Sequence, residues 1–189
     1  MAEKKKRKGR RAYLNDFYTD VTGNTVYTGQ MIRYAGEMPW RGAARRTGVL
    51  TGAVTACALI VFCLPAPSMT GMNKSYVVLP LILEAVGVLL TVWAAVRLLC
   101  NGPDLRSYVW EASAKKLPWW LEMTAVFAAV GVVGNVIYLA VKGFGGKVFL
   151  SLLVIVLHLL TIAAALFEIR FLRTVKWSGG EELPPAGKA

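Results

Sequence analysis

The sequence has little of the chemistry that metal centres and disulfide frameworks require. It contains three cysteines and one histidine. Cys57 and Cys63 are six residues apart and so lie on different faces of a helix, and Cys100 is far from both. We therefore expect neither a disulfide framework nor a metal site.

The motifs of common catalytic sites are also missing. No glycine-rich loop ends in Lys-Ser or Lys-Thr, and GxSxG, HExxH and CxxC do not occur. We expect no cofactor, and we expect the protein not to be an enzyme. A membrane enzyme that works through Glu84, His158 or the loop acids Asp104 and Glu111 is the enzymatic alternative.

Charged residues are scarce, and hydrophobic residues take their place. Charged residues make up 17% of the chain, compared with about 25% in an average soluble domain. Hydrophobic residues make up 56%, compared with about 45–50%. A run of about 18 apolar residues can cross the roughly 30 Å hydrocarbon core of a bilayer. Four segments approach or meet this length, and too few polar residues remain to cover a soluble bundle. The sequence therefore predicts four membrane-spanning helices, at about residues 47–64, 76–99, 119–141 and 148–171.

Basic residues are distributed unevenly around these spans. Nineteen of the 22 Lys and Arg residues fall on one side: before the first span, around the loop between the second and third, or near the end of the fourth. Loops rich in Lys and Arg stay in the cytoplasm, so both termini are predicted to be cytoplasmic. Orientation and attraction to anionic lipid headgroups then explain the net charge of +11, and nucleic acid is not an expected partner.

Residues 1–46 consist of a basic tail at 1–11 and an aromatic juxtamembrane segment. In that segment Gly23-Asn24 stands between DVT and TVY, which is typical of a β-hairpin with a two-residue loop. Such a loop pairs Thr22 with Thr25, Val21 with Val26 and Asp20 with Tyr27.

A lone hairpin is marginal in water and needs a surface to pack on. The loop at residues 100–118, the lipid headgroups and another protein are the alternatives, and a loosely structured linker is a fourth. Aromatic rings with a polar tip suit interfaces. The candidate partner or lipid surface comprises Tyr13, Phe17, Tyr18, Tyr27 and Tyr34.

The remaining segments on this side are short. In the loop at 100–118, Leu105, Tyr108, Val109 and Ala112 have helical spacing, which predicts an amphipathic helix along the membrane surface. Residues 172–189 are rich in Gly and Pro and are predicted to be disordered.

Each predicted span carries a polar residue at a similar depth. At about 1.5 Å per residue, Glu84, His158, Asn135 and Thr55 lie roughly 9–15 Å from the outer helix ends. These four form the candidate intramembrane polar site, because a carboxyl and an imidazole that meet can share a proton. The alternative is packing, since Asn, Thr and His commonly hydrogen-bond between helices. Glu122 and Glu168 are expected near the cytoplasmic interface, reaching headgroups or a basic neighbour.

The sequence thus predicts an all-α membrane protein, a four-transmembrane-helix bundle with a short cytoplasmic N-terminal segment that contains a hairpin signal. Its function is interpreted as that of a non-enzymatic subunit or accessory protein of a membrane complex, with a protein partner or homo-oligomer. The alternative is a small oligomeric transporter that couples protons or cations through Glu84 and His158.

Overall fold

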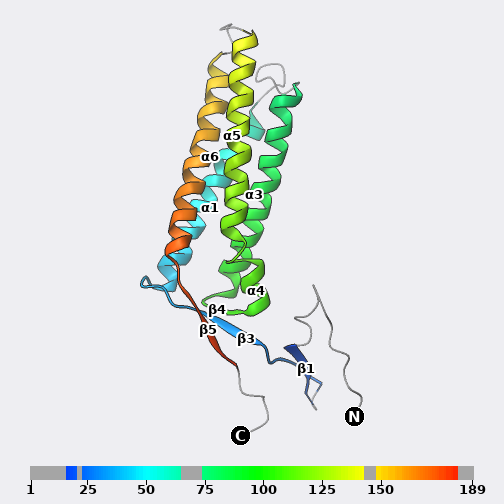
Figure 1. Cartoon of the computed structure of the whole chain (residues 1–189), viewed down its shortest axis with the longest axis vertical. Helices are drawn as coiled ribbons and strands as arrows, with labels where there is room; N and C mark the ends of the chain where they lie inside the picture. The colour runs from blue at the N-terminus through cyan, green and yellow to red at the C-terminus, as the bar shows by residue number, and fades with distance from the viewer. Residues whose placement is uncertain (1–15, 21–22, 65–73, 143–147, 183–189) are drawn as a thin grey trace.

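The computed structural model describes residues 16–20, 23–64, 74–142 and 148–182, and a bundle of four long helices dominates it (Figure 1). All four helices are long and apolar enough to cross a membrane, which points to a multi-pass membrane protein. The prediction of four long apolar helices is therefore confirmed. Their bounds are α1 (Trp40–Cys63), α3 (Ser75–Asn101), α5 (Leu117–Lys142) and α6 (Val148–Thr174).

The four helices form a closed square. In order around it, α1 packs against α3, α3 against α5, α5 against α6, and α6 against α1. Helices joined by short connections are usually neighbours, and the contacts of α1 with α3 and of α5 with α6 follow this rule. As a result α3 and α6 face each other across one diagonal, and α1 and α5 across the other.

Local backbone chemistry sets the helix ends. Pro39 comes directly before α1, and its carbonyl oxygen accepts hydrogen bonds from the N–H groups of Gly42 and Ala43, at 2.9 and 3.1 Å. At the other end of α1, Leu64 is extended, as expected for a residue that precedes a proline. After α3, Gly102 adopts a φ of +76°, a conformation that residues with a Cβ rarely adopt, and the chain leaves the helix there.

A three-stranded antiparallel sheet lies at one end of the bundle (Figure 1). Its strand order is β4-β3-β5. Because β3 precedes α1 and β5 follows α6, segments from near both termini meet at this end of the bundle, which we call the sheet end. A short helix, α4 (Ser107–Ala112), follows β4. The strands are β3 (Gln30–Tyr34), β4 (Asp104–Arg106) and β5 (Trp177–Glu182).

This sheet differs from the sequence predictions in two places. The loop at 100–118 was expected to contain an amphipathic helix that includes Leu105. A helix is present as α4, but Leu105 belongs to β4 and lies opposite Ile32. Residues 172–189 were expected to be disordered, but α6 continues to Thr174 and β5 follows it up to Glu182. Residues 183–189 lie outside the described residues. In both places, pairing with β3 satisfies backbone groups that a single short segment cannot satisfy by itself.

The predicted hairpin is present as β1 (Phe17–Thr19) and β2 (Thr25–Tyr27), but in a different register. Tyr18, not Val21, lies opposite Val26, and Thr19, not Thr22, lies opposite Thr25. Val21 and Thr22 lie outside the described residues. The connection is longer than Gly23-Asn24, because the N–H of Asp20 donates to the carbonyl oxygen of Asn24 at 2.8 Å.

The register follows from the aromatic residues. Phe17 lies opposite Tyr27, with ring centroids 5.1 Å apart, and both rings also contact Tyr108 at the start of α4. The expected register would have placed Asp20 opposite Tyr27. Of the surfaces proposed for the hairpin, the loop at 100–118 is therefore one that it contacts.

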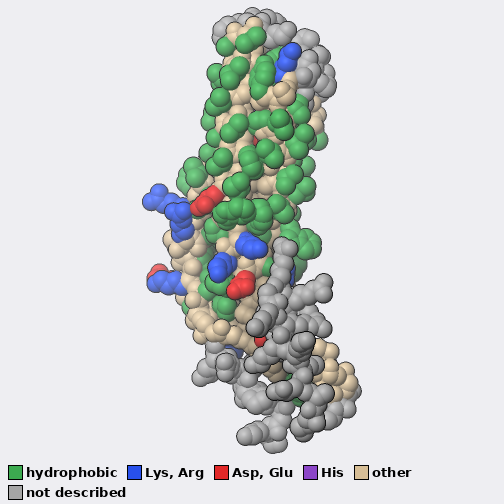
Figure 2. All heavy atoms as spheres, turned by 45° about the vertical axis from the view of Figure 1, so that its right-hand side comes forward, with side chains coloured by type: hydrophobic (Ala, Val, Ile, Leu, Met, Phe, Trp, Pro, Cys, Tyr) green, Lys and Arg blue, Asp and Glu red, His purple; other side chains and the backbone are tan. Residues whose placement is uncertain are grey.

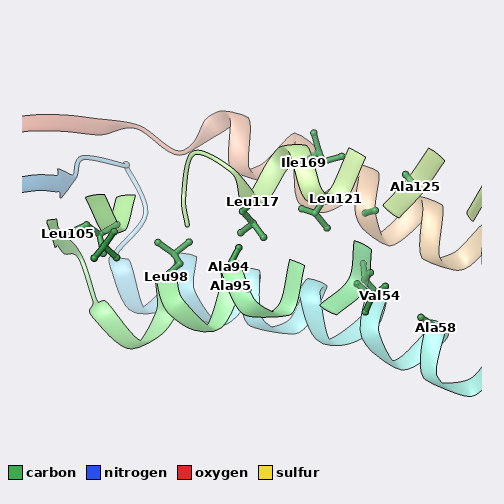
Figure 3. Packing of buried hydrophobic residues seen from close by; sticks show 13 residues of the cluster. Val54, Ala58, Ala94, Ala95, Leu98, Leu105, Leu117, Leu121, Ala125 and Ile169 are labelled. Atoms are coloured by element: carbon green, nitrogen blue, oxygen red, sulfur yellow. The ribbon is translucent and has the colours of Figure 1, made fainter. Parts of the chain in front are cut away.

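The apolar core has two parts with a polar layer between them. The larger part lies toward the sheet end and includes Leu98, Leu105, Leu117 and Leu121 (Figure 3). The smaller part lies toward the other end and consists of Val61, Leu81, Val154 and Leu157. Glu84 follows Leu81 on α3 and precedes Val88 of the larger part. The polar layer thus interrupts the core in the half of the bundle away from the sheet end.

The outer surface of the bundle is hydrophobic. Large apolar side chains such as Leu89, Trp93 and Phe149 expose 68%, 67% and 76% of their area. On the face in Figure 2, hydrophobic side chains cover the bundle, and charged side chains gather toward the sheet end. A surface of this kind is stable in lipid rather than in water.

Candidate functional site

Glu84 and His158 meet in the interior of the bundle. Oε2 of Glu84 lies 2.8 Å from Nδ1 of His158, and each side chain exposes 1% of its area. Because α3 and α6 are diagonal partners, this contact crosses the middle of the bundle. The two atoms are close enough for an ion pair, but the contact does not have the angles of a hydrogen bond.

Helical spacing explains why both side chains point inward. On α6 the buried residues recur every three or four positions, which keeps them on one face. On α3 the buried stripe runs through Leu81, Glu84, Val88 and Thr91. The buried residues on α6 include Ser151, Val154, His158, Thr161, Ala165 and Glu168.

Gly131 on α5 makes room for the imidazole. A Cβ added to Gly131 would lie 3.0 Å from Nε2 of His158, closer than most such contacts. The carbonyl oxygen of Gly131 accepts a hydrogen bond from Nδ2 of Asn135 at 2.9 Å. Asn135 is buried, with 1% of its area exposed. It lies one helical turn after Gly131, the residue that contacts the His158 ring. Three helices thus contribute to one buried polar layer.

Several oxygens in this interior have no hydrogen-bond partner among the described residues. They include Oε1 of Glu84, Oδ1 of Asn135 and Oγ1 of Thr91. An unpaired polar atom in an apolar interior costs about 1–3 kcal/mol. A carboxyl and an imidazole at this distance can hold one proton between them, and the spare acceptors could receive a further donor.

Thr55 does not join this layer. It is only partly buried, and its hydroxyl donates to the carbonyl oxygen of Thr51 on the same helix at 2.7 Å. Of the four predicted residues, the structure brings Glu84 and His158 into contact and places Asn135 nearby through Gly131. Thr55 bonds within its own helix.

A second buried acid differs from its prediction. Glu168 was expected to reach the lipid headgroups or a basic neighbour, but it is 0% exposed, and its Oε1 accepts a hydrogen bond from the hydroxyl of Thr51 at 2.6 Å. Its spacing of seven from Thr161 and three from Ala165 was the available signal, because it places Glu168 on the buried face of α6. Glu122 meets its expectation of a basic neighbour, since Oε1 lies 3.1 Å from Nη2 of Arg173.

The aromatic residues of the N-terminal segment pack largely against their own chain. The hydroxyl of Tyr27 donates to the carbonyl oxygen of Gln30 at 3.2 Å and lies 3.0 Å from Oγ of Ser107. Tyr18 points outward and is 36% exposed. Tyr13 lies outside the described residues.

Tyr34 belongs to a second aromatic cluster, with Trp40 and Trp177. Its ring centroid is 5.4 Å from that of Trp40 and 5.7 Å from that of Trp177. Since these residues come from β3, α1 and β5, the cluster fixes the sheet to the bundle. Within the described ranges, no three His, Cys, Asp or Glu side chains gather as a metal site would require.

Comparison with known proteins finds no relative: no protein-family model matches the chain, and neither the curated proteins nor the solved structures include a significant match.

Proposed function

We propose that the protein is a non-enzymatic subunit or accessory protein of a membrane complex, and that a partner protein recognises its sheet end. The observation that carries this proposal is the sheet β4-β3-β5, which joins three segments distant in sequence. The rings of Tyr34, Trp40 and Trp177 fix it to the helix ends. A bundle that only spans a bilayer needs no more than short loops at its ends.

The proposed contact is strand addition. In the order β4-β3-β5, the outer strands are edges, and an edge strand can pair with an extended segment of another protein. β5 is the longer edge strand, so we place the partner's segment there. We further propose that the sheet end faces the cytoplasm, because Lys and Arg are concentrated in the segments that meet there.

The sealed interior supports a non-enzymatic role. Glu84, His158 and Glu168 each expose 1% of their area or less. A general acid or base must come within hydrogen-bonding distance of its substrate. These groups contact one another or Thr51 instead.

Site-specific photo-crosslinking in intact membranes tests this proposal. A photoreactive amino acid replaces Ser178, an exposed residue of β5, in one sample and Val136, a lipid-facing residue of α5, in the other. We expect the probe at Ser178 to give one discrete adduct with another protein, and the probe at Val136 to give none of that mass. Equal yields from both positions, or adducts only with lipid or with a second copy of the chain, would overturn the proposal.

The Glu84–His158 contact favours a second candidate, a small oligomeric transporter for protons or cations. An ionisable pair inside a membrane bundle is costly and often marks an ion path. Here Oε2 of Glu84 and Nδ1 of His158 are 2.8 Å apart, between the diagonally opposed helices α3 and α6. The acid and the base could pass one proton between α3 and α6.

Ion flux measured in liposomes containing the purified protein tests this second candidate. Glu84→Gln and His158→Gln keep the side-chain size but remove the acid and the base, so both should abolish flux. Glu122→Gln is the matched control, because Glu122 is an exposed acid on α5. The transporter hypothesis fails if the Glu84 and His158 variants carry the same flux as the unsubstituted protein.

A further inference from the structure

A second charged site lies at the sheet end, away from the Glu84–His158 pair. It is a cavity of about 390 Å³, formed by the connection between β3 and α1, the second turn of α1 and the end of α6. This volume falls within the roughly 300–1,000 Å³ of small-molecule sites. The cavity is therefore large enough for a lipid headgroup.

The charges in the cavity wall are mainly positive. Arg46, Arg173 and Lys176 line it, and Glu37 is the one acid in the lining. The guanidinium of Arg46 lies 4.7 Å from the ring centroid of Phe171, which holds it at the wall. Among the described residues, neither Arg46 nor Lys176 has an ion-pair partner, whereas Arg173 also contacts Glu122. Two unpaired cations and a third, shared one suit a phosphate group.

The sheet places Lys176 at this cavity. Its carbonyl oxygen accepts a hydrogen bond from the N–H of Ala35 at 2.9 Å, and the next residue, Trp177, lies opposite Tyr34 in the sheet. Lys176 is thus fixed between α6 and β5, although it is 130 residues from Arg46 in the sequence. The cationic site exists because β5 folds back onto β3.

The neighbouring surface is suited to acyl chains. Arg46 is the last charged residue before the apolar part of α1, so the cavity lies at the boundary between polar and apolar surface. Val49 and Phe167 lie one turn deeper, three residues after Arg46 and four before Phe171. They expose 64% and 67% of their area. A free phosphate ion would leave this apolar surface unused.

We propose that this cavity binds the phosphate headgroup of an anionic phospholipid, whose acyl chains lie along α1 and α6. The lipid would connect the sheet end to the membrane surface. This inference goes beyond the proposed partner protein and does not depend on it.

Native mass spectrometry of the full chain in detergent micelles tests the site, with phosphatidylglycerol as the probe and phosphatidylcholine as the neutral reference. The protein should retain one phosphatidylglycerol in preference to phosphatidylcholine. Because a basic residue near a membrane surface contributes about 1 kcal/mol, Arg46→Gln and Lys176→Gln should each weaken retention about fivefold. Arg46→Lys keeps the charge and should lose less.

Arg45→Gln is the matched control, because it removes the same charge from an exposed neighbouring residue that does not line the cavity. It should leave retention nearly unchanged, and thermal melting of each variant confirms that it is folded. If Arg45→Gln weakened retention of phosphatidylglycerol as much as Arg46→Gln, the lipid would be held by diffuse surface charge, and the proposed site would be wrong. Displacement of phosphatidylglycerol by millimolar inorganic phosphate would mean a site for a free anion and would overturn the lipid.

Discussion

The interior of the bundle and its sheet end each hold an acid of one helix beside a base on α6, but in opposite surroundings. Glu84 on α3 lies 2.8 Å from His158, and both side chains are 1% exposed. Glu122 on α5 lies 3.1 Å from Arg173, and these side chains are 47% and 71% exposed. Exposed pairs contribute little because water competes for the charges, whereas breaking a buried pair leaves a group that nothing solvates. Burial, not distance, separates the two pairs.

The largest predicted effect comes from removing one member of the buried pair. His158→Ala leaves the Glu84 carboxyl without its partner and opens a cavity beside Gly131, so we expect a loss of about 3–5 kcal/mol in the free energy of unfolding. Reversible unfolding in mixed detergent micelles measures this. Replacing both residues by leucine should recover most of the loss, because no unpaired polar group then remains. If His158→Ala loses no more than an exposed-pair variant, burial is not what separates the two pairs.

A smaller effect is expected where the interior is crowded. Gly131→Ala would bring a Cβ to 3.0 Å from Nε2 of His158, so it should cost about 1–3 kcal/mol. Gly52→Ala is the control, because nothing lies within 4 Å of the added atom. Alanine is more stable than glycine in a helix interior, so Gly52→Ala should raise the free energy of unfolding by about 0.5–1 kcal/mol. The same unfolding assay measures both variants, and the two changes must have opposite signs for the packing to be as described.

At the sheet end, Trp177→Ala should weaken the attachment of β5. Its ring contacts Tyr34 and Trp40, and each aromatic pair contributes about 0.5–1.5 kcal/mol, so we expect a local loss of about 1–3 kcal/mol. Hydrogen exchange at the β3 and β5 amides measures it. Trp93→Ala on the lipid-facing side of α3 should leave that exchange unchanged. Unaltered exchange in Trp177→Ala would show that backbone pairing alone holds the strand.

The smallest effect is expected at the exposed pair. Glu122→Gln should change the free energy of unfolding by less than about 1 kcal/mol, and added salt should reduce the difference further. A double-mutant cycle with Arg173→Gln isolates the pair. A coupling as large as that between Glu84 and His158 would remove the contrast between the two regions.

Much of the helical part could be predicted from the sequence, because each span is a long apolar run whose length alone is informative. Counting residues from the helix ends placed Glu84 and His158 at similar depths, and they are in contact. Depth does not fix rotation about the helix axis, and for that reason Thr55 was grouped with them although it bonds to its own helix.

The strands could not be predicted in the same way. β4 has three residues, and β5 reads WSGGEE, without the alternation of apolar and polar residues that marks a strand. Each forms only because β3 is beside it, which is a long-range property. Glu168 was misplaced for a related reason: its position near a helix end indicated an interface, whereas it is buried and bonded to Thr51 on α1.

The sheet also imposes an order on biogenesis. β3 is synthesised before the first span, and its partner β5 follows the last, so the two strands can pair only after all four helices have been made. About 140 residues separate Tyr34 from Trp177, a delay of roughly 7–30 s at a synthesis rate of about 5–20 residues per second. A chain that stops early, or that inserts one helix too few, leaves β3 and β5 on opposite sides of the membrane or β3 without its partner. The completed sheet therefore records that these four helices have all been inserted.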